Sequence, residues 1–165
     1  MSAGLTTDRI TLGDSASFSK TFTEADTYLY AGITGDLNPA HIDQVQSESS
    51  IFGGRIVHGM LSAGLISAVL GTRLPGPGTI YVGQDLSFTA PVRFGDTITA
   101  TVTAAEWIKG KFLRLQTTCS NQDGLVVLDG FATVKPPKEL IPEDVKRERD
   151  AEARKGAESL AEGVN

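Results

Sequence analysis

Cysteine and histidine are scarce in this sequence. Cys119 is the only cysteine in 165 residues, and there are two histidines. One cysteine cannot form a disulfide within the chain, and its isolation suits a reducing compartment such as the cytoplasm. Two histidines and a lone cysteine are also too few for a convincing transition-metal site, so we expect no bound metal.

Long apolar runs and an excess of positive charge are missing as well. No uninterrupted apolar stretch is long enough to cross a bilayer, and residues 60–70 are better explained as a buried helix. Residues 1–7 lack the charged and apolar regions of a secretory signal, so we expect none. The formal net charge of -5 gives no general attraction to nucleic acid or to an anionic membrane. We therefore expect neither as a partner, and local basic residues must meet any anionic substrate.

Residues 58–72 predict a helix that is buried on most sides. Large apolar residues are spread around it without a polar stripe, and small residues fill the remaining positions. The glycines and prolines of residues 74–78 end this helix.

Most of the remaining sequence predicts strands. A weak alternation predicts a first strand at residues 17–22. Stronger alternation and turn signals predict later strands at residues 79–82, 85–88, 97–107, 112–120 and 125–134, and the first two of these also fit one bent strand. Residues 109–111 and 121–124 are plausible hairpin turns. The pattern is therefore one buried helix followed by an antiparallel meander. A curved sheet wrapped around a central helix, the α+β hot-dog arrangement, accounts for this pattern.

Two further segments complete the predicted organisation. Thr23 is placed to cap a helix over residues 24–31, with Asp26 at the third position beyond it. Tyr28, Leu29 and Ile33 would supply the apolar face of this helix, and Gly32 and Gly35 would end it. Residues 43–50 predict a short helical turn. We expect one domain over residues 1–134, followed by a charged tail at 135–165 that is solvated or disordered by default.

Asp36 and His41 place an acid and a base in one short loop. A carboxylate and an imidazole can together orient a water molecule and take its proton, and an ordinary histidine pKa of about 6.5 allows this at neutral pH. Asn38 and Pro39 stiffen the loop between them. The alternative is that Asp36 is a turn residue and His41 a structural histidine.

Gly59 favours the catalytic interpretation. Its N–H lies near the start of the buried helix, where backbone donors lack intrahelical partners and the helix dipole adds positive potential. A substrate oxygen can approach glycine closely, as an oxyanion hole requires. The alternative is a tight turn into the helix. His58 beside it is better explained as a structural hydrogen-bonding residue than as a second base.

These residues stand in a recognisable motif. Residues 35–43 (GDLNPAHID) and 52–60 (FGGRIVHGM) closely resemble the hydratase motif of MaoC-like (R)-specific enoyl-CoA hydratases, which include enzymes that supply polyhydroxyalkanoate synthesis. Residues 78–88 and 91–96 are also similar to that family, and the resemblance covers residues 17–134.

The resemblance implies a reaction and roles for its residues. Asp36 and His41 would activate water for addition to C3 of a trans-2-enoyl thioester, with syn protonation at C2 giving a (3R)-3-hydroxyacyl product. Gly59 would hold the thioester oxygen, and Asn38 would orient the loop. Ser67 matches a pocket serine of the family, although it also suits a packed helix face. Leu70 would set the depth of the acyl pocket.

The resemblance also implies partners. No cofactor is expected, and coenzyme A enters only as part of the substrate. Its phosphates would be met by basic residues, for which Arg55, Arg73, Arg93, Lys109 and Lys111 are candidates. A homodimer that joins sheets edge to edge is expected, with the acyl tunnel near its interface.

Three alternative functions differ in their requirements. A 3-hydroxyacyl-acyl carrier protein dehydratase would use the same residues, and surface contacts would decide the carrier. A hot-dog thioesterase usually places an acid on the central helix, but no Asp or Glu occurs between His58 and Leu74. A non-catalytic acyl-CoA binding module would not need Asp36 and His41, and this chain has both.

Overall fold

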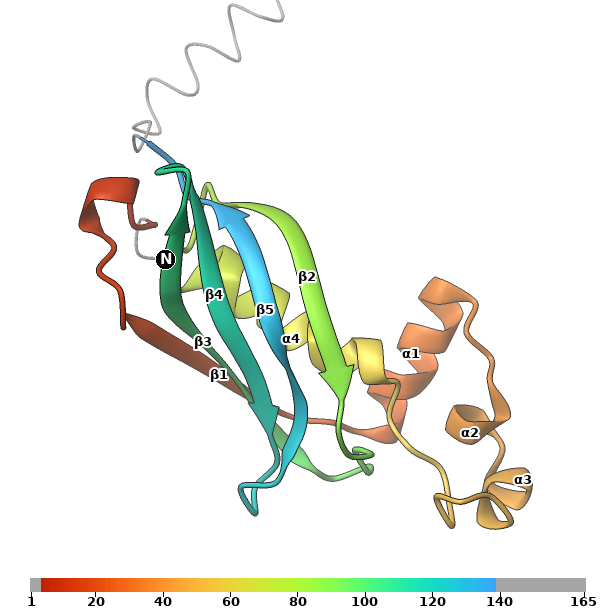
Figure 1. Ribbon diagram of the computed structural model, residues 1–165. Coiled ribbons are helices and arrows are strands. Elements are labelled where there is room, and N and C mark those ends of the chain that lie inside the picture. The colour runs from red at the N-terminus through yellow and green to blue at the C-terminus, as the bar shows by residue number, and fades with distance from the viewer. Residues whose placement is uncertain (1–3, 139–165) are drawn as a thin grey trace, which may run out of the picture.

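A five-stranded antiparallel sheet and one long helix form the body of the protein (Figure 1). The computed structural model describes residues 4–138. The strands follow the order β1-β3-β4-β5-β2 across the sheet. The elements are η1 (Thr7–Arg9), β1 (Ser15–Thr21), α1 (Glu24–Thr34), α2 (Pro39–Ile42), α3 (Gln44–Glu48), α4 (Gly59–Thr72), β2 (Ile80–Phe88), β3 (Thr97–Ile108), β4 (Phe112–Ser120) and β5 (Val126–Lys135). Among the described residues, no helix is both long enough and apolar enough to cross a membrane.

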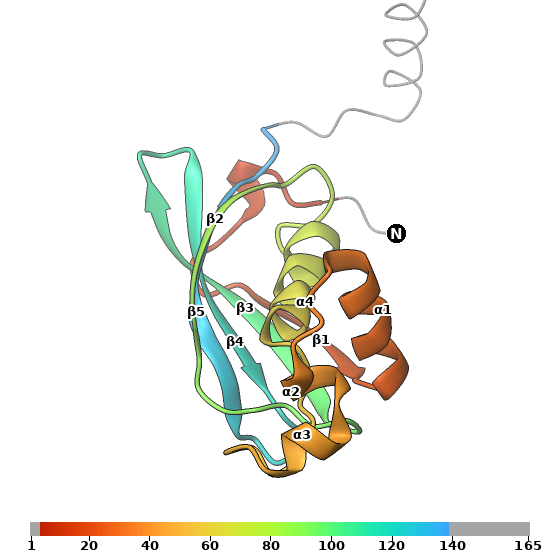
Figure 2. The same ribbon diagram turned by 90° about the vertical axis from the view of Figure 1, so that its right-hand side faces the viewer.

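The helix α4 lies along the concave face of the curved sheet (Figure 2). Its buried residues include Leu65, Ile66 and Val69, which belong to one apolar core with the inward side chains of the strands. Every second residue of β3 is buried from Ile98 to Ala104, and every second residue of β4 from Leu113 to Cys119. The predicted alternation and the hot-dog arrangement are therefore confirmed.

The second strand departs from a simple meander. β3, β4 and β5 are consecutive neighbours, but β2 pairs with β5 and forms an edge of the sheet. The two short strands predicted at 79–82 and 85–88 are one strand, whose pairing is irregular between Tyr81 and Gly83. The prediction of one bent strand is thus confirmed. The connection between β2 and β3 leads from this edge strand to the strand beside the opposite edge. Alternation along the chain cannot indicate this strand order.

The predicted apolar face of the first helix is wrong. Tyr28, Leu29 and Ile33 are all exposed, whereas Thr27 and Ala31 are buried. The reason is that α1, α2 and α3 form a helical group beyond the end of the sheet, near the first turn of α4 (Figure 1). The helix does begin with the predicted capping box between Thr23 and Asp26.

Gly35, and not Gly32, ends α1. Gly35 has φ 76°, a left-handed conformation that favours glycine, and its N–H donates to the carbonyl of Ala31. A glycine within a helix is tolerated at a cost of about 1 kcal/mol, so Gly32 does not stop it.

The end of the sheet lies close to the predicted domain boundary. β5 ends at Lys135, one residue beyond the predicted limit of 134. The carbonyl of Pro137 accepts a hydrogen bond of 3.1 Å from the N–H of Thr7, which joins the end of the described chain to its beginning. The rest of the predicted tail, from residue 139 onwards, lies outside the described residues.

Candidate active site

The loop that carries Asp36 is held by local hydrogen bonds. Gly35 ends α1, and the Asp36 Oδ1 atom accepts a bond of 3.2 Å from the N–H of Asn38. Asn38 caps α2, because its Oδ1 accepts from the N–H of Ala40 at 3.1 Å, and Pro39 occupies the first position of this helix. The sequence Gly-Asp-Leu-Asn-Pro thus builds a fixed turn into α2, and His41 lies in this helix rather than in the predicted loop.

A backbone carbonyl fixes the ring of His41. The Nδ1 atom of His41 lies 2.9 Å from the carbonyl oxygen of Ile56, and the N–H of Ile56 donates to the carbonyl of Ala40 at 3.0 Å. Because a carbonyl only accepts, Nδ1 carries the proton of this bond. In the neutral ring the Nε2 atom then keeps its lone pair and can accept a proton.

His58 brings a third titratable group to the same place. One potential ligand atom from each of Asp36, His41 and His58 lies within 4.8 Å of the other two. The rings of the two histidines have centroids 3.8 Å apart and planes inclined by 31°. Rings stacked in this way cannot direct their in-plane lone pairs at one ion with good geometry, so the cluster is a poor fit to a metal site.

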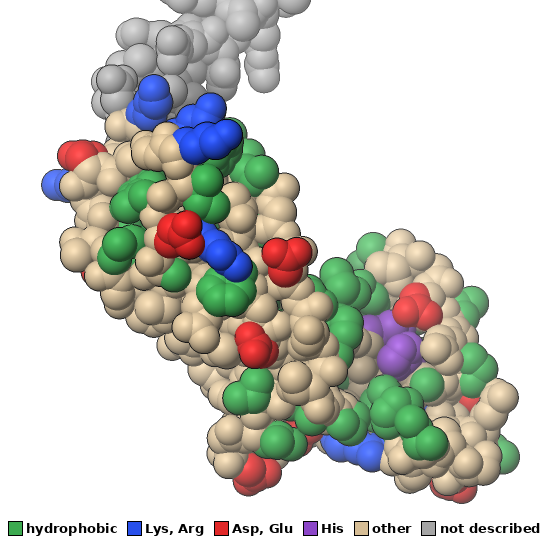
Figure 3. Space-filling view, in the orientation of Figure 1, with side chains coloured by type: hydrophobic (Ala, Val, Ile, Leu, Met, Phe, Trp, Pro, Cys, Tyr) green, Lys and Arg blue, Asp and Glu red, His purple; other side chains and the backbone are tan. Residues whose placement is uncertain are grey.

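Gly59 is the first residue of α4, directly after His58. The N–H groups at the start of a helix have no intrahelical acceptor, so that of Gly59 can donate to another group. Gly59 lines a cavity of about 440 Å³ together with Asp36, His58, Ser62 and Phe88. Figure 3 shows a small part of the buried histidine side chains where the helical group meets the body of the protein.

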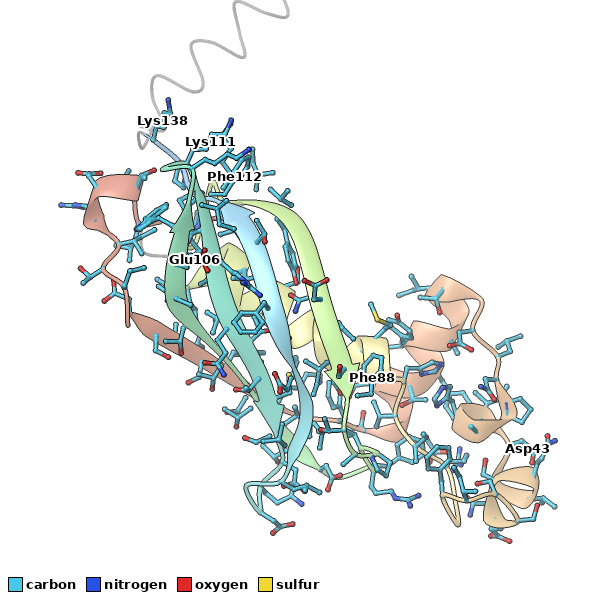
Figure 4. The ribbon with its side chains drawn as sticks, viewed as in Figure 1. Asp43, Phe88, Glu106, Lys111, Phe112 and Lys138 are labelled. Carbon is cyan, nitrogen blue, oxygen red and sulfur yellow. The ribbon has the colours of Figure 1, made fainter. Side chains whose placement is uncertain are left out.

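A ring packs where a side chain at Gly59 would lie. A Cβ atom built on Gly59 would be 2.6 Å from the Cε1 atom of Phe88, closer than such atoms approach one another. Figure 4 shows Phe88 at the end of β2, beside the first turn of α4. Gly59 therefore has a packing reason to be glycine in addition to the predicted approach of a substrate oxygen.

The structure brings together some of the predicted site residues and not others. Asp36 and Gly59 line the cavity, His41 is stacked on His58, and Asn38 caps α2, the helix that carries His41. Ser67 is exposed on α4, and Leu70 is 1% exposed within the core. Neither Ser67 nor Leu70 lines this cavity, so their predicted pocket roles stay predictions.

Sequence reasoning missed the contacts of three residues around the site: it gave Ser62 and Phe88 no role, and it named Arg93 only as a candidate phosphate-binding residue. Ser62 lines the cavity from α4, and its buried Oγ has no hydrogen-bond partner among residues 4–138. Phe88 packs on Gly59 from a distant strand. The Arg93 guanidinium donates to the carbonyls of Phe52, Gly54 and Arg55, which hold the loop before Ile56. No local signal links Phe88 or Arg93 to the residues that they contact.

The candidate phosphate-binding residues are mostly engaged elsewhere. Arg55 pairs with Glu24, and this bond raises the pKa of Arg55. Arg73 donates to the carbonyl of Ser17, and Arg93 is occupied by its three carbonyls. Lys111 lies at the opposite end of the sheet from Phe88 (Figure 4), and Lys109 lies in the same hairpin turn. Within one chain, none of them is a lining residue of the cavity.

Comparisons with known proteins show the family of this chain. The chain is 56% identical over 126 residues to an (R)-specific enoyl-CoA hydratase of Rhodospirillum rubrum, which covers 76% of this chain and 87% of the relative. It is 52% identical over 120 residues to a 3-hydroxybutyryl-CoA dehydratase of Methylorubrum extorquens, covering 72% and 76%. The unliganded R-hydratase of Pseudomonas aeruginosa has a TM-score of 0.78 and 38% identity, covering 85% of this chain and 93% of that one. Residues 10–122 match the MaoC like domain, and the chain belongs to this family.

Proposed function

We propose that this protein is an (R)-specific enoyl-CoA hydratase, a hydro-lyase that adds water reversibly to trans-2-enoyl-CoA to give (3R)-3-hydroxyacyl-CoA. The observation that carries the proposal is the hydrogen bond that fixes the ring of His41 and its tautomer. Its Nδ1 is bound to the Ile56 carbonyl, which leaves Nε2 as the available base beside Asp36. The names of the relatives from Rhodospirillum rubrum and Methylorubrum extorquens support the same reaction in its two directions.

Asp36 and His41 would perform the proton transfers. A water molecule held between the Asp36 carboxylate and His41 Nε2 gives one proton to this pair, and its oxygen forms the bond to C3 of the enoyl group. The pair returns one proton to C2, on the face from which the water came. We assign these transfers to the pair as a unit, because atoms of both side chains lie within reach of one water molecule.

Gly59 would stabilise the charge that develops during addition. When oxygen bonds to C3, negative charge moves through C2 to the thioester oxygen, and the Gly59 N–H at the start of α4 can donate to that oxygen. The thioester itself activates the double bond, so the mechanism requires no metal or cofactor. The apolar part of the cavity lining, with Phe52, Val57 and Phe88, would exclude water from the acyl chain.

The two sheet edges suggest how a homodimer would form. The edge strand β1 exposes Ser15, Ser17, Ser19 and Thr21, which are polar. The opposite edge strand β2 exposes large apolar side chains at both ends, namely Ile80, Tyr81, Val82 and Phe88. An apolar strand with an unpaired edge favours pairing with another strand, so β2 is the edge that we propose for dimerisation.

Hydration of crotonyl-CoA by the purified protein tests the proposed function. Loss of the enoyl-thioester absorbance reports the addition of water, and an (R)-specific or (S)-specific dehydrogenase reads the product. We expect hydration with only the (3R) product. If neither crotonyl-CoA nor a medium-chain enoyl-CoA reacted, the proposal would be wrong. If the protein hydrated only an enoyl-acyl carrier protein, it would be a carrier-protein dehydratase instead.

A further inference from the structure

His58 contacts both members of the proposed catalytic pair. Its Nε2 atom lies 3.0 Å from the main-chain oxygen of Asp36, and its ring is stacked on that of His41 with centroids 3.8 Å apart. It also directly precedes Gly59 in the chain. The side chain of His58 therefore contacts both members of the pair, and its main chain is joined to the proposed oxyanion donor.

The hydrogen bond defines how His58 is oriented. Because the Asp36 carbonyl only accepts, the Nε2 atom of His58 carries the proton in this bond. Its Nδ1 atom is buried and has no hydrogen-bond partner among residues 4–138. Its ring, only 2% exposed, has another aromatic neighbour in Tyr30 of α1, whose centroid is 4.9 Å away.

The unpartnered Nδ1 atom argues that His58 is present for more than packing. A buried nitrogen without a partner lowers stability, and a phenylalanine of similar shape would fill the same space without that cost. Buried polar atoms of this kind need an explanation, and departures from good local packing concentrate at functional sites. The explanation here is the bond from Nε2 to the loop of Asp36.

We propose that His58 is a positioning residue for the Asp36–His41 pair. The Nε2–H of His58 fixes the main chain at Asp36, and its ring fixes the plane of His41, while His58 itself exchanges no proton with substrate. This inference rests on the proposed function, because it assigns a task within that reaction. It predicts an effect on turnover that is separate from any effect on folding.

Two substitutions separate the contacts. His58→Phe keeps a ring to stack on His41 but removes the donor to Asp36, and also removes the unpartnered nitrogen. His58→Gln keeps an N–H donor in a similar place but removes the ring. Tyr30→Phe is the matched control, because it removes a hydroxyl from another ring beside His58 and leaves both contacts unchanged.

We expect His58→Phe to lower kcat by about 10- to 100-fold, the scale of a misplaced catalytic group, with KM within about threefold. The melting temperature should be equal to or above that of the wild type. His58→Gln should fall between the wild type and His58→Phe, and Tyr30→Phe should keep the wild-type kcat. A kcat for His58→Phe within twofold of the wild type would overturn the proposal.

The pH profile separates positioning from a role as a second base. The titratable groups that face His58 are Asp36, His41 and Tyr30. If His58 only positions the pair, the profile of kcat against pH keeps its shape in His58→Gln and is lowered throughout. Loss of one limb of the profile in that variant would make His58 a proton-transferring group and overturn the proposal.

A measurement without substrate keeps this inference distinct from the proposed function. The chain has two histidines, so His58→Phe leaves only the His41 signals and assigns both imidazoles in ¹⁵N nuclear magnetic resonance spectra. We expect the neutral wild-type protein to carry the proton on Nδ1 of His41 and on Nε2 of His58. A proton on Nδ1 of His58 would overturn the proposal even if the enzyme acts on no enoyl thioester. If His58→Phe does not fold, His58→Gln supplies the same assignment.

Discussion

The ring of Phe88 occupies the space that a side chain at Gly59 would need. A Cβ atom on Gly59 would lie 2.6 Å from one ring carbon and 2.9 Å from the next. Phe88 is 53% exposed, so its ring has room to move away from such an atom. The glycine allows this close packing of α4 on β2, which an alanine would shift rather than forbid, and we propose that the glycine also serves the approach of a thioester oxygen.

Gly59→Ala and the double variant Gly59→Ala/Phe88→Ala separate these two roles. We expect Gly59→Ala to lower kcat by about 10²-fold, the size of effect seen when one oxyanion donor is lost. The double variant should stay low, because the new methyl group still obstructs the N–H, and Phe88→Ala alone supplies the reference. Recovery of kcat in the double variant would show that Gly59 matters only for the ring.

Arg93 organises the loop that precedes the Ile56 carbonyl. Its guanidinium donates to Gly54 at 3.2 Å, to Arg55 at 3.4 Å and to Phe52. A lysine ammonium is a single point charge and cannot span these acceptors. We expect Arg93→Lys to lower kcat by about tenfold through the bond between Ile56 and His41.

The control for Arg93→Lys is the same substitution at Arg114, which is also half-buried and does not line the cavity. Arg114 makes a surface ion pair of 3.7 Å with Glu106, and such pairs contribute about 0–1 kcal/mol. Its guanidinium also lies 4.1 Å from the centroid of the Phe131 ring, but neither contact touches the candidate site, so Arg114→Lys should leave kcat almost unchanged. Equal kcat values for the two lysine variants would show that the Arg93 contacts do not influence the position of His41.

Asp26 makes the stability of α1 depend on pH. Hydrogen bonds from the backbone N–H and then the hydroxyl of Thr23 lower the pKa of Asp26 to about 2. A carboxylate has a pKa of about 3.9 when unfolded, so its contribution is complete above pH 4 and is lost as the pH falls towards 2. Asp26→Asn should lower the free energy of unfolding at pH 7 by about 1 kcal/mol, a typical value for helix caps.

Urea unfolding of Asp26→Asn and wild type at several pH values checks this prediction. The difference between the two proteins should shrink between pH 4 and pH 2. Asp129→Asn, at an exposed position of β5, is the matched control and should show no such difference. A difference between Asp26→Asn and wild type that persists unchanged at pH 2 would contradict the cause given for the lowered pKa.

Leu70 has a stability role that is independent of any pocket. It is 1% exposed among the core side chains, and replacing a buried leucine by alanine costs about 2–5 kcal/mol. Leu70→Ala should lose this much in urea unfolding. Its rate profile, measured where the variant is folded, tests the predicted pocket role: a shift towards longer acyl chains supports it, and an unchanged profile removes Leu70 from the pocket.

The parts of the fold that could be predicted depend on short-range signals. The Thr23–Asp26 capping box is encoded within four consecutive residues, and the buried faces of β3 and β4 follow from strict alternation. The place of β2 beside β5 could not be predicted, because alternation does not specify which strand is the neighbour. The exposed face of α1 was missed for a related reason, since periodicity does not say what a helix packs against.

The same distinction applies to the candidate site. Asp36, His41 and Gly59 stand in two short motifs whose residue types indicate their chemistry, and the structure places Asp36 and Gly59 on one cavity. The stacking of His58 on His41 and the packing of Phe88 on Gly59 join segments that are distant in the sequence. Such contacts depend on how the helical group meets α4, which one sequence does not reveal.

The central proposal is that Asp36 and His41 exchange protons with water and substrate. The most direct measurement is kcat for crotonyl-CoA hydration by Asp36→Asn and His41→Ala, with Asp43→Asn as the matched control. Asp43 (labelled in Figure 4) caps α3 through a bond of 3.0 Å from the Gln46 N–H, and asparagine can cap equally well. We predict a fall of about 10²- to 10⁴-fold for Asp36→Asn and for His41→Ala, with folding intact and no fall for Asp43→Asn. If either Asp36→Asn or His41→Ala kept most of the wild-type kcat, the assigned pair would be wrong.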